Sequence, residues 1–181
     1  KEIQTPSFED NQTVDSMGGS ILLNGGVLQI QEKLTLSGSL IETGGGNLIL
    51  HDGALLNQGS SIKLDNGTLE LGDNLTLVGS TLHADEGLLK LLDHVSLVIP
   101  GSVSFREIQL QQKTLNLDSS VTSLNLSEQL ILKYTEERII GNQAQLVFQE
   151  GVKIDEGGIF EMDDASKIQV DAITLDGGLL K

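Results

Sequence analysis

The three histidines are the first residues to test for chemistry, because an imidazole can act as a general base or as a metal ligand. They stand at positions 51, 83 and 94. Each lies in a different segment of the chain, and no two have the spacing of a metal-binding motif. We therefore interpret His51, His83 and His94 as surface residues. From these histidines we predict neither a catalytic residue nor a metal ligand, and we expect no cofactor.

Neighbouring carboxylates are a second candidate, because glycoside hydrolysis uses two carboxyl groups that flank one sugar bond. Asp163 and Asp164 are adjacent, and Glu161 is close by. Adjacent residues of a strand point to opposite faces of a sheet, so a turn explains the pair more simply. We predict that the chain is not an enzyme. A polysaccharide-active enzyme on a β-helix stays open as an alternative.

Acidic corner sequences are a third candidate, because carboxylate and carbonyl oxygens bind calcium. Such sequences occur at residues 65–67, 155–158 and 176–178. However, the nonapeptide repeat GGxGxDxUx that builds calcium-loaded coils is absent, and Asp-Gly or Asn-Gly is ordinary turn chemistry. We predict no metal site. A calcium- or carbohydrate-binding module remains an alternative function.

A row of outward threonines could bind ice, and the repeat described below predicts one outward column on the third strand of each coil. This column reads Thr35, Thr76, Ser96 and Asn116. The column is chemically mixed, and the chain contains no Thr-x-Thr motif. Ice binding is therefore not predicted.

Composition excludes several partners. The chain has 26 Asp and Glu against 11 Lys and Arg, and its formal net charge is −15. Nucleic acids and anionic membranes need clustered cations, which are missing. No apolar run is long enough to cross a bilayer. Cysteine is absent and aromatic residues make up 3%, so the core must consist of Leu, Ile and Val.

The strongest signal is a repeat of about 20 residues. Residues 59–77, GSSIKLDNGTLELGDNLTL, hold three pairs of alternating apolar residues separated by Asn- or Asp-containing glycine turns. Such a unit predicts three short strands that trace one triangular coil. Gly-Ser dipeptides begin at 19, 38, 59, 79 and 101. Self-similarity at this period is typical of a solenoid.

Hydrophobic positions recur with the same period, and we expect each set to form one inward column of stacked side chains. The sequence thus predicts an all-β protein, a parallel β-helix (β-solenoid) of about eight coils with three short strands per coil. The three predicted columns are Ile62, Leu82, Val103, Leu124, Leu146 and Ile168; Ile30, Leu50, Leu71, Leu91 and Leu110; and Leu34, Leu55, Leu75, Val95 and Leu115.

Some segments depart from this pattern. We interpret residues 1–18 as an N-terminal cap or linker and 19–181 as the solenoid, which we expect to be a fragment of a longer one. Residues 86–95 also fit helical spacing, but their register with the flanking coils favours strands. The coil after Pro100 is short, and 119–142 is the least regular stretch, with a possible helical turn around 135–138. Leucine-rich repeats and a β-sandwich are the alternative folds.

Residues 53–80, GALLNQGSSIKLDNGTLELGDNLTLVGS, resemble the haemagglutinin-type repeats of large bacterial secreted adhesins, which include filamentous haemagglutinins and autotransporter passengers. The similarity lies in the rhythm of glycines and L-x-L pairs and extends over roughly 19–118. It implies a right-handed helix that is secreted or displayed on the cell surface as a rigid stalk or filament segment. The adhesin context implies a host-surface receptor or glycan as a partner. Separately, the apolar face of the last coil, formed by Ile173, Leu175 and Leu179, predicts contacts with neighbouring solenoid segments or with copies of the chain end to end.

Overall fold

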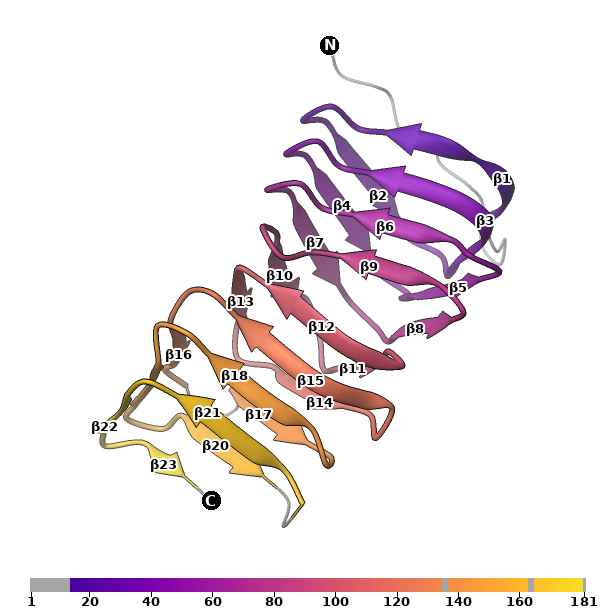
Figure 1. The fold of residues 1–181 in the computed structure, drawn as a ribbon. Helices are drawn as coiled ribbons and strands as arrows, with labels where there is room; N and C mark the ends of the chain where they lie inside the picture. Colours follow the sequence, from indigo (N-terminus) through magenta and orange to yellow (C-terminus); the bar gives the residue numbers. More distant parts are fainter. Residues whose placement is uncertain (1–13, 135–136, 163–164, 181) are drawn as a thin grey trace.

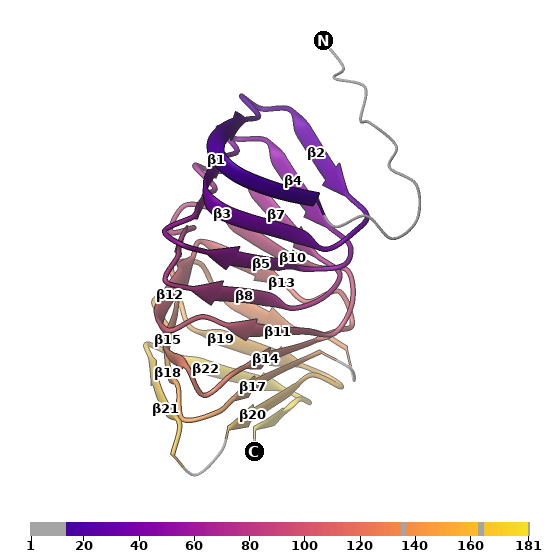
Figure 2. The ribbon, with the colours of Figure 1, turned by 90° about the vertical axis from the view of Figure 1, so that its right-hand side faces the viewer.

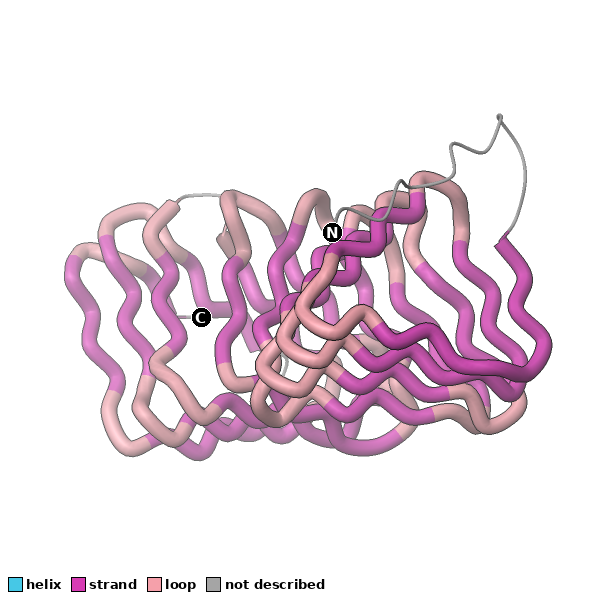
Figure 3. Tube along the Cα trace, turned by 90° about the horizontal axis from the view of Figure 1, so that it is seen from above, coloured by secondary structure: helices cyan, strands magenta, loops and turns pink. Residues whose placement is uncertain are grey.

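The chain folds as a β-solenoid of about seven turns, slightly fewer than the eight coils expected. A computed structural model describes residues 14–134, 137–162 and 165–180. Strands alternate with loops that stack at the corners, and no helix occurs in these ranges (Figures 1 and 3). The described part of the chain therefore offers no helical membrane span. The predicted fold class, a parallel β-helix, is confirmed.

The first face is a parallel ladder that runs through the whole solenoid, and Figure 2 shows its strands stacked one above another. It begins with the N-terminal parts of two long strands, β1 (Val14–Leu22) and β3 (Leu34–Glu42). The remaining strands of this face are β5 (Ala54–Asn57), β8 (Leu75–Val78), β11 (Val95–Val98), β14 (Thr114–Leu117), β17 (Arg138–Gly141), β20 (Ile159–Met162) and β23 (Leu179–Leu180).

The second face is interrupted once. The C-terminal parts of β1 and β3 pair there and continue into two further strands, after which a new sheet begins. The strands before the interruption are β6 (Ser61–Lys63) and β9 (Thr81–His83), and those after it are β12 (Gly101–Phe105), β15 (Val121–Leu126), β18 (Gln145–Phe148) and β21 (Lys167–Val170).

The third face is also interrupted once, but further along the chain. Its first sheet consists of β2 (Val27–Ile30), β4 (Asn47–Leu50), β7 (Thr68–Leu71), β10 (Leu88–Leu91) and β13 (Glu107–Gln109). Its second sheet consists of β16 (Leu130–Leu132), β19 (Val152–Asp155) and β22 (Ile173–Asp176).

Alternation of side chains explains why these segments form strands. In β7, Leu69 and Leu71 are fully buried, whereas Thr68 and Glu70 are half-buried on the outside. The same pattern recurs along the chain, so inward residues of successive coils lie above one another and form one core of mainly Leu, Ile and Val. Phe148 and Phe160 extend this core with an edge-to-face contact at 5.8 Å between ring centroids.

Glycine is required at two kinds of corner. Gly38 has a φ of +62°, which lets β3 turn from the first face to the second without strain. At the corner before the third face, a Cβ on Gly67 would collide with Thr43 Oγ1 and with the backbone oxygen of Gly46. The coils can therefore approach closely there only because the side chain is absent.

Two of the predicted columns are largely confirmed. Ile30, Leu50, Leu71 and Leu91 are paired in successive strands of the third face, and Leu110 is buried just after β13. On the second face the predicted column is paired at every step except one. That step, from Leu82 to Val103, crosses from β9 to β12, where the described strands form no ladder.

The third predicted column is wrong at three of its four steps, the two that involve Leu55 and the one from Leu75 to Val95. Leu34 pairs with Ala54 of the next coil and not with Leu55, so Ala54 is buried and Leu55 points outward. Leu75 pairs with Leu97 instead of Val95, a shift of the ladder by two residues. The error arose because both Leu55 and Leu56 are apolar, and sequence spacing alone cannot tell which of two adjacent leucines faces the core.

The ambiguous segments can now be assigned. Residues 86–95 contain β10 and lead into β11, so the strand interpretation is confirmed. The helical turn expected at 135–138 falls partly on 135–136, outside the described residues. The backbone N–H of Glu137 donates to the carbonyl of Tyr134, and Arg138 begins β17. At the N-terminus, regular pairing begins with Val14, inside the stretch assigned to a cap or linker.

Candidate functional site

The most distinctive site lies where the third face is interrupted. β13 is the last strand of one sheet and β16 the first strand of the next. Among the described residues, no backbone hydrogen bond joins 107–111 to 129–134. We call these two segments, together with Glu137, the splayed site. The first and second faces stay paired at the same level, through β14 with β17 and β12 with β15.

Unequal corners explain why the two strands separate. Between β12 and β13 the chain turns with Arg106 alone, whereas residues 84–87 make the same corner in the preceding coil and 127–129 make it in the following one. A coil with a shortened corner cannot follow the path of its neighbours on every face. Pairing is therefore lost on one side and retained on the other two.

Glu137 holds the separated coils together at one end of the splayed site. Its side chain is 5% exposed. The carboxylate accepts hydrogen bonds from the backbone N–H groups of Lys133 at 2.6 Å and Tyr134 at 3.3 Å. It also accepts one from the backbone N–H of Gln112, in the preceding coil, at 3.2 Å. A buried carboxylate that accepts several N–H groups replaces the ladder hydrogen bonds that this corner lacks.

Arg106 and Glu128 close the other end. The backbone N–H of Glu128 donates to the carbonyl of Arg106 at 2.9 Å. Their side chains form an ion pair, with 3.3 Å between Arg106 Nε and Glu128 Oε1. The opening between β13 and β16 is thus fixed at both ends.

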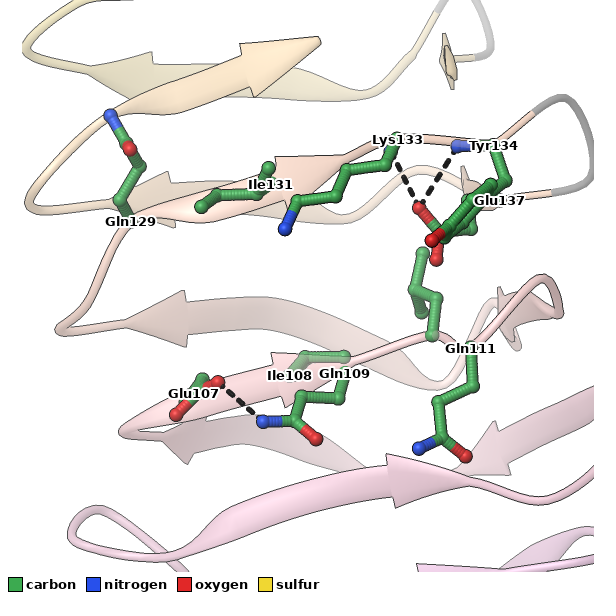
Figure 4. Close-up of a pocket in the computed structure, with 10 residues that line it drawn as sticks. Glu107, Ile108, Gln109, Gln111, Gln129, Ile131, Lys133, Tyr134 and Glu137 are labelled. Carbon is green, nitrogen blue, oxygen red and sulfur yellow. Dashed lines mark hydrogen bonds between the residues drawn. The ribbon is translucent and has the colours of Figure 1, made fainter. Parts of the chain in front are cut away.

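The splayed site forms an open cavity of about 270 Å³, shown in Figure 4. Ile108 and Leu110 are buried on its inner side, while Ile131 and Tyr134 are 38% and 49% exposed on its rim. The other lining residues are polar or charged: Glu107, Gln109, Gln111, Gln129, Lys133 and Glu137. The site therefore combines an apolar floor with hydrogen-bonding walls.

A second hollow of about 410 Å³ lies at the corner between the second and third faces. Asp65, His83, Asp85 and Glu86 line it together with Lys63. Lys63 bonds to Asp65 at 3.0 Å and to Glu42 at 3.3 Å, and these hydrogen bonds, that to Asp65 first, raise the pKa of Lys63 above its ordinary value. The lysine thus already neutralises part of this acidic corner.

The structure keeps the three histidines apart. His51 lies beside Gln29, with 2.8 Å between their side-chain nitrogens. His94 accepts the backbone N–H of Thr114 through Nδ1 at 3.0 Å. His83 lines the hollow beside Lys63. No group of metal-binding side chains forms within the described ranges.

The structure does not test the pair of carboxylates proposed for sugar chemistry. Asp163 and Asp164 lie outside the described residues, and Glu161 is half-buried in β20. Asp155, from one of the proposed calcium corners, pairs with Lys153 at 2.6 Å, and this hydrogen bond raises the pKa of Lys153. In two of the three corners a lysine therefore occupies the place where a cation would have to bind.

The predicted outward column on the first face is not continuous. Leu55 lies between Thr35 and Thr76 in the ladder, and Thr76 pairs with Val98 instead of Ser96. Only its last step is present, where the side-chain amide of Asn116 donates to Ser96 Oγ at 3.3 Å. A leucine in the row interrupts any flat array of hydroxyl groups.

Sequence reasoning did not identify Glu137 or the cavity. The available signal was the shortened coil after Pro100, followed by the irregular stretch 119–142. That signal located the disturbance but could not show which face would lose its pairing.

Comparison of the chain with protein-family models, with curated proteins and with solved structures found no match. Function is therefore inferred from the sequence, fold and surface of this chain.

Proposed function

We propose that this chain is a rigid stalk or filament segment of a secreted or surface-displayed adhesin, located outside the cell. The observation that carries the proposal is the first face, whose ladder extends without interruption from β1 to β23. The resemblance of residues 53–80 to adhesin repeats supplies the surface context.

A solenoid of this kind suits a spacer because its length is set by the number of coils. Coils stack at about 4.8 Å, so seven turns correspond to a rod of roughly 30–35 Å. Each coil contacts only its neighbours, and further coils lengthen the rod without changing its cross-section. Length can therefore be adjusted by adding repeats.

The acidic surface suits a rod that must stay soluble. The excess of Asp and Glu gives a formal net charge of −15. Like charges on neighbouring rods repel one another, which opposes side-by-side association of sheets.

The last described coil supports contact with another solenoid segment. Ile173 and Leu175 of β22 pair with the buried residues Val152 and Ile154, so they point toward the core. They are nevertheless 37% and 54% exposed. A following coil, either of a continuing chain or of a copy stacked end to end, would cover them.

Rigidity can be tested directly because the chain has no cysteine. Exposed positions near the two ends, Lys33 and Thr174, can be changed to cysteine and spin-labelled. If the chain is a rigid stalk, pulsed electron paramagnetic resonance should give one narrow distribution of the distance between the two spin labels. A broad distribution would contradict the proposal. Turnover of acidic or neutral polysaccharides by the purified chain would favour the enzyme instead.

A further inference from the structure

The splayed site leaves two strand edges without partners inside an otherwise paired face. β13 pairs with β10 on one side and β16 pairs with β19 on the other. The sides that face each other form no backbone hydrogen bonds within the described residues. Unpaired N–H and C=O groups of a strand edge are a template for another strand.

The opening between β13 and β16 is preorganised for binding a peptide strand, because both of its ends are already fixed. Glu137 bridges the two coils at one end, and the Arg106–Glu128 contacts bridge them at the other. Little ordering of the protein is then needed on binding, which lowers the free-energy cost of association.

The residues that line the opening indicate which kind of peptide would bind there. In an inserted strand, every second side chain would point inward and pack against Ile108 and Leu110. The remaining side chains would point outward and lie beside Gln109 and Ile131. Two carboxylates, Glu107 and Glu137, line the cavity against one ammonium group, Lys133. Together with the net charge of −15, this favours a positively charged guest.

We propose that the splayed site binds an extended, positively charged peptide segment of a partner protein, which inserts between β13 and β16 and completes the third face. Backbone hydrogen bonds supply the affinity, and alternating apolar side chains set the register. This binding role is independent of the proposed stalk function, because it depends on the opening between two coils and not on the rigidity of the rod.

The test uses the 181-residue chain and a library of seven-residue peptides in which Lys, Arg or Thr alternates with Val, Ile or Leu. We expect some of these peptides to bind and to slow hydrogen exchange of the amides at 107–111 and 129–134. Scrambled peptides of the same composition should bind at least about tenfold more weakly, because they cannot place apolar residues on one face. Equal binding of scrambled peptides, or no binding in the library, would overturn the proposal.

Site variants separate this site from general attraction to an acidic surface. Ile131→Lys adds a positive charge at the exposed rim, and we expect it to weaken binding about tenfold. Thr174→Lys adds the same charge at an exposed outward position of the same face and should leave binding unchanged. Equal effects of the two variants would place the peptide elsewhere.

Hydrogen exchange also tests the opening without any peptide. In the free chain, those amides at 108–110 and 130–132 that point into the opening should exchange faster than the amides of β4 and β7, which are paired on both sides. The N–H of Leu130, which donates to the carbonyl of Gly151, should stay protected. Strong protection of both segments in the free monomer would show that no vacant edge exists. Protection that appears only at high protein concentration would identify a second copy as the guest and overturn the partner peptide.

Discussion

The coils over residues 47–98 and those over 101–141 have equally well-buried cores but differ in their ladders. Leu69 and Leu71 in the first region are fully buried, and so are Leu124 and Leu132 in the second. All three faces are paired in the first region. In the second region, the third face loses its pairing between β13 and β16.

This difference shows that the core and the ladder depend on different parts of the sequence. Alternating apolar residues direct side chains inward in both regions, so the core is continuous. Pairing between coils additionally requires corners of matched length, and Arg106 alone replaces a longer turn in the second region. The coil with the shortened corner is the one beside which the wall of the solenoid opens.

The largest effect should come from truncating a core leucine in the regular region. Leu71→Ala is expected to lower the free energy of unfolding by about 3–5 kcal/mol, because it leaves a cavity between fully packed coils. Ile108→Ala should cost less, about 2 kcal/mol, because its side chain already borders a cavity. Urea unfolding measures both. An equal or larger loss at Ile108 would mean that the two regions are packed alike.

Removing the charge of Glu137 should have the next largest effect. Glu137→Gln retains the shape of the side chain but weakens its hydrogen bonds to three backbone N–H groups, which should cost about 1–3 kcal/mol. Faster hydrogen exchange should be confined to residues near 112 and 133–134. The exposed control Asp171→Asn should change stability by less than about 0.5 kcal/mol. If both variants behave alike, Glu137 does not hold the coils together.

A smaller effect concerns acid stability at the corner after β14. The backbone N–H of Ser120, followed by its side chain, lowers the pKa of Asp118 below its ordinary value of 3.8. The folded state thus prefers the ionised carboxylate, and this contribution is present above pH 3.8 and disappears as the pH falls through the lowered pKa. Asp118→Asn should therefore reduce the loss of stability in that acidic range. Thermal melts between neutral and acidic pH measure this effect. If the turn is unimportant, the melting temperature of the variant will fall with pH as steeply as that of the original chain.

Calcium should have no effect on either region. Asp65 is paired with Lys63 in the regular coils, and Asp155 with Lys153 further on, so a lysine ammonium group already neutralises each carboxylate. We expect the melting temperature to be the same with calcium and with a chelator. A higher melting temperature in calcium would revive the calcium-binding module and contradict our interpretation of these corners.

Much of the fold could be predicted from the sequence because the repeat is fixed by simple chemistry. Alternation identifies strands, and glycines such as Gly67 mark the corners where coils touch. The column from Ile30 to Leu91 was therefore placed correctly. The first face was harder, because adjacent apolar residues such as Leu55 and Leu56 leave the inward position undecided.

The splayed site could not be predicted in the same way. Its existence depends on how three faces share the strain of one short corner, and that is a property of the stacked coils together. Glu137 shows the limit clearly: it resembles any surface glutamate in the sequence, yet it is buried because residues 133–134 turn their N–H groups toward it.

The unbroken first face has a mechanical consequence. When the rod is pulled along its axis, tension is shared by three ladders over most of its length, but by two at each interruption. The first face carries load at every level, so it decides whether the rod survives, and unwinding should start where one of its two companions is missing. The coil that opens the wall is thus also the place where the rod would yield first.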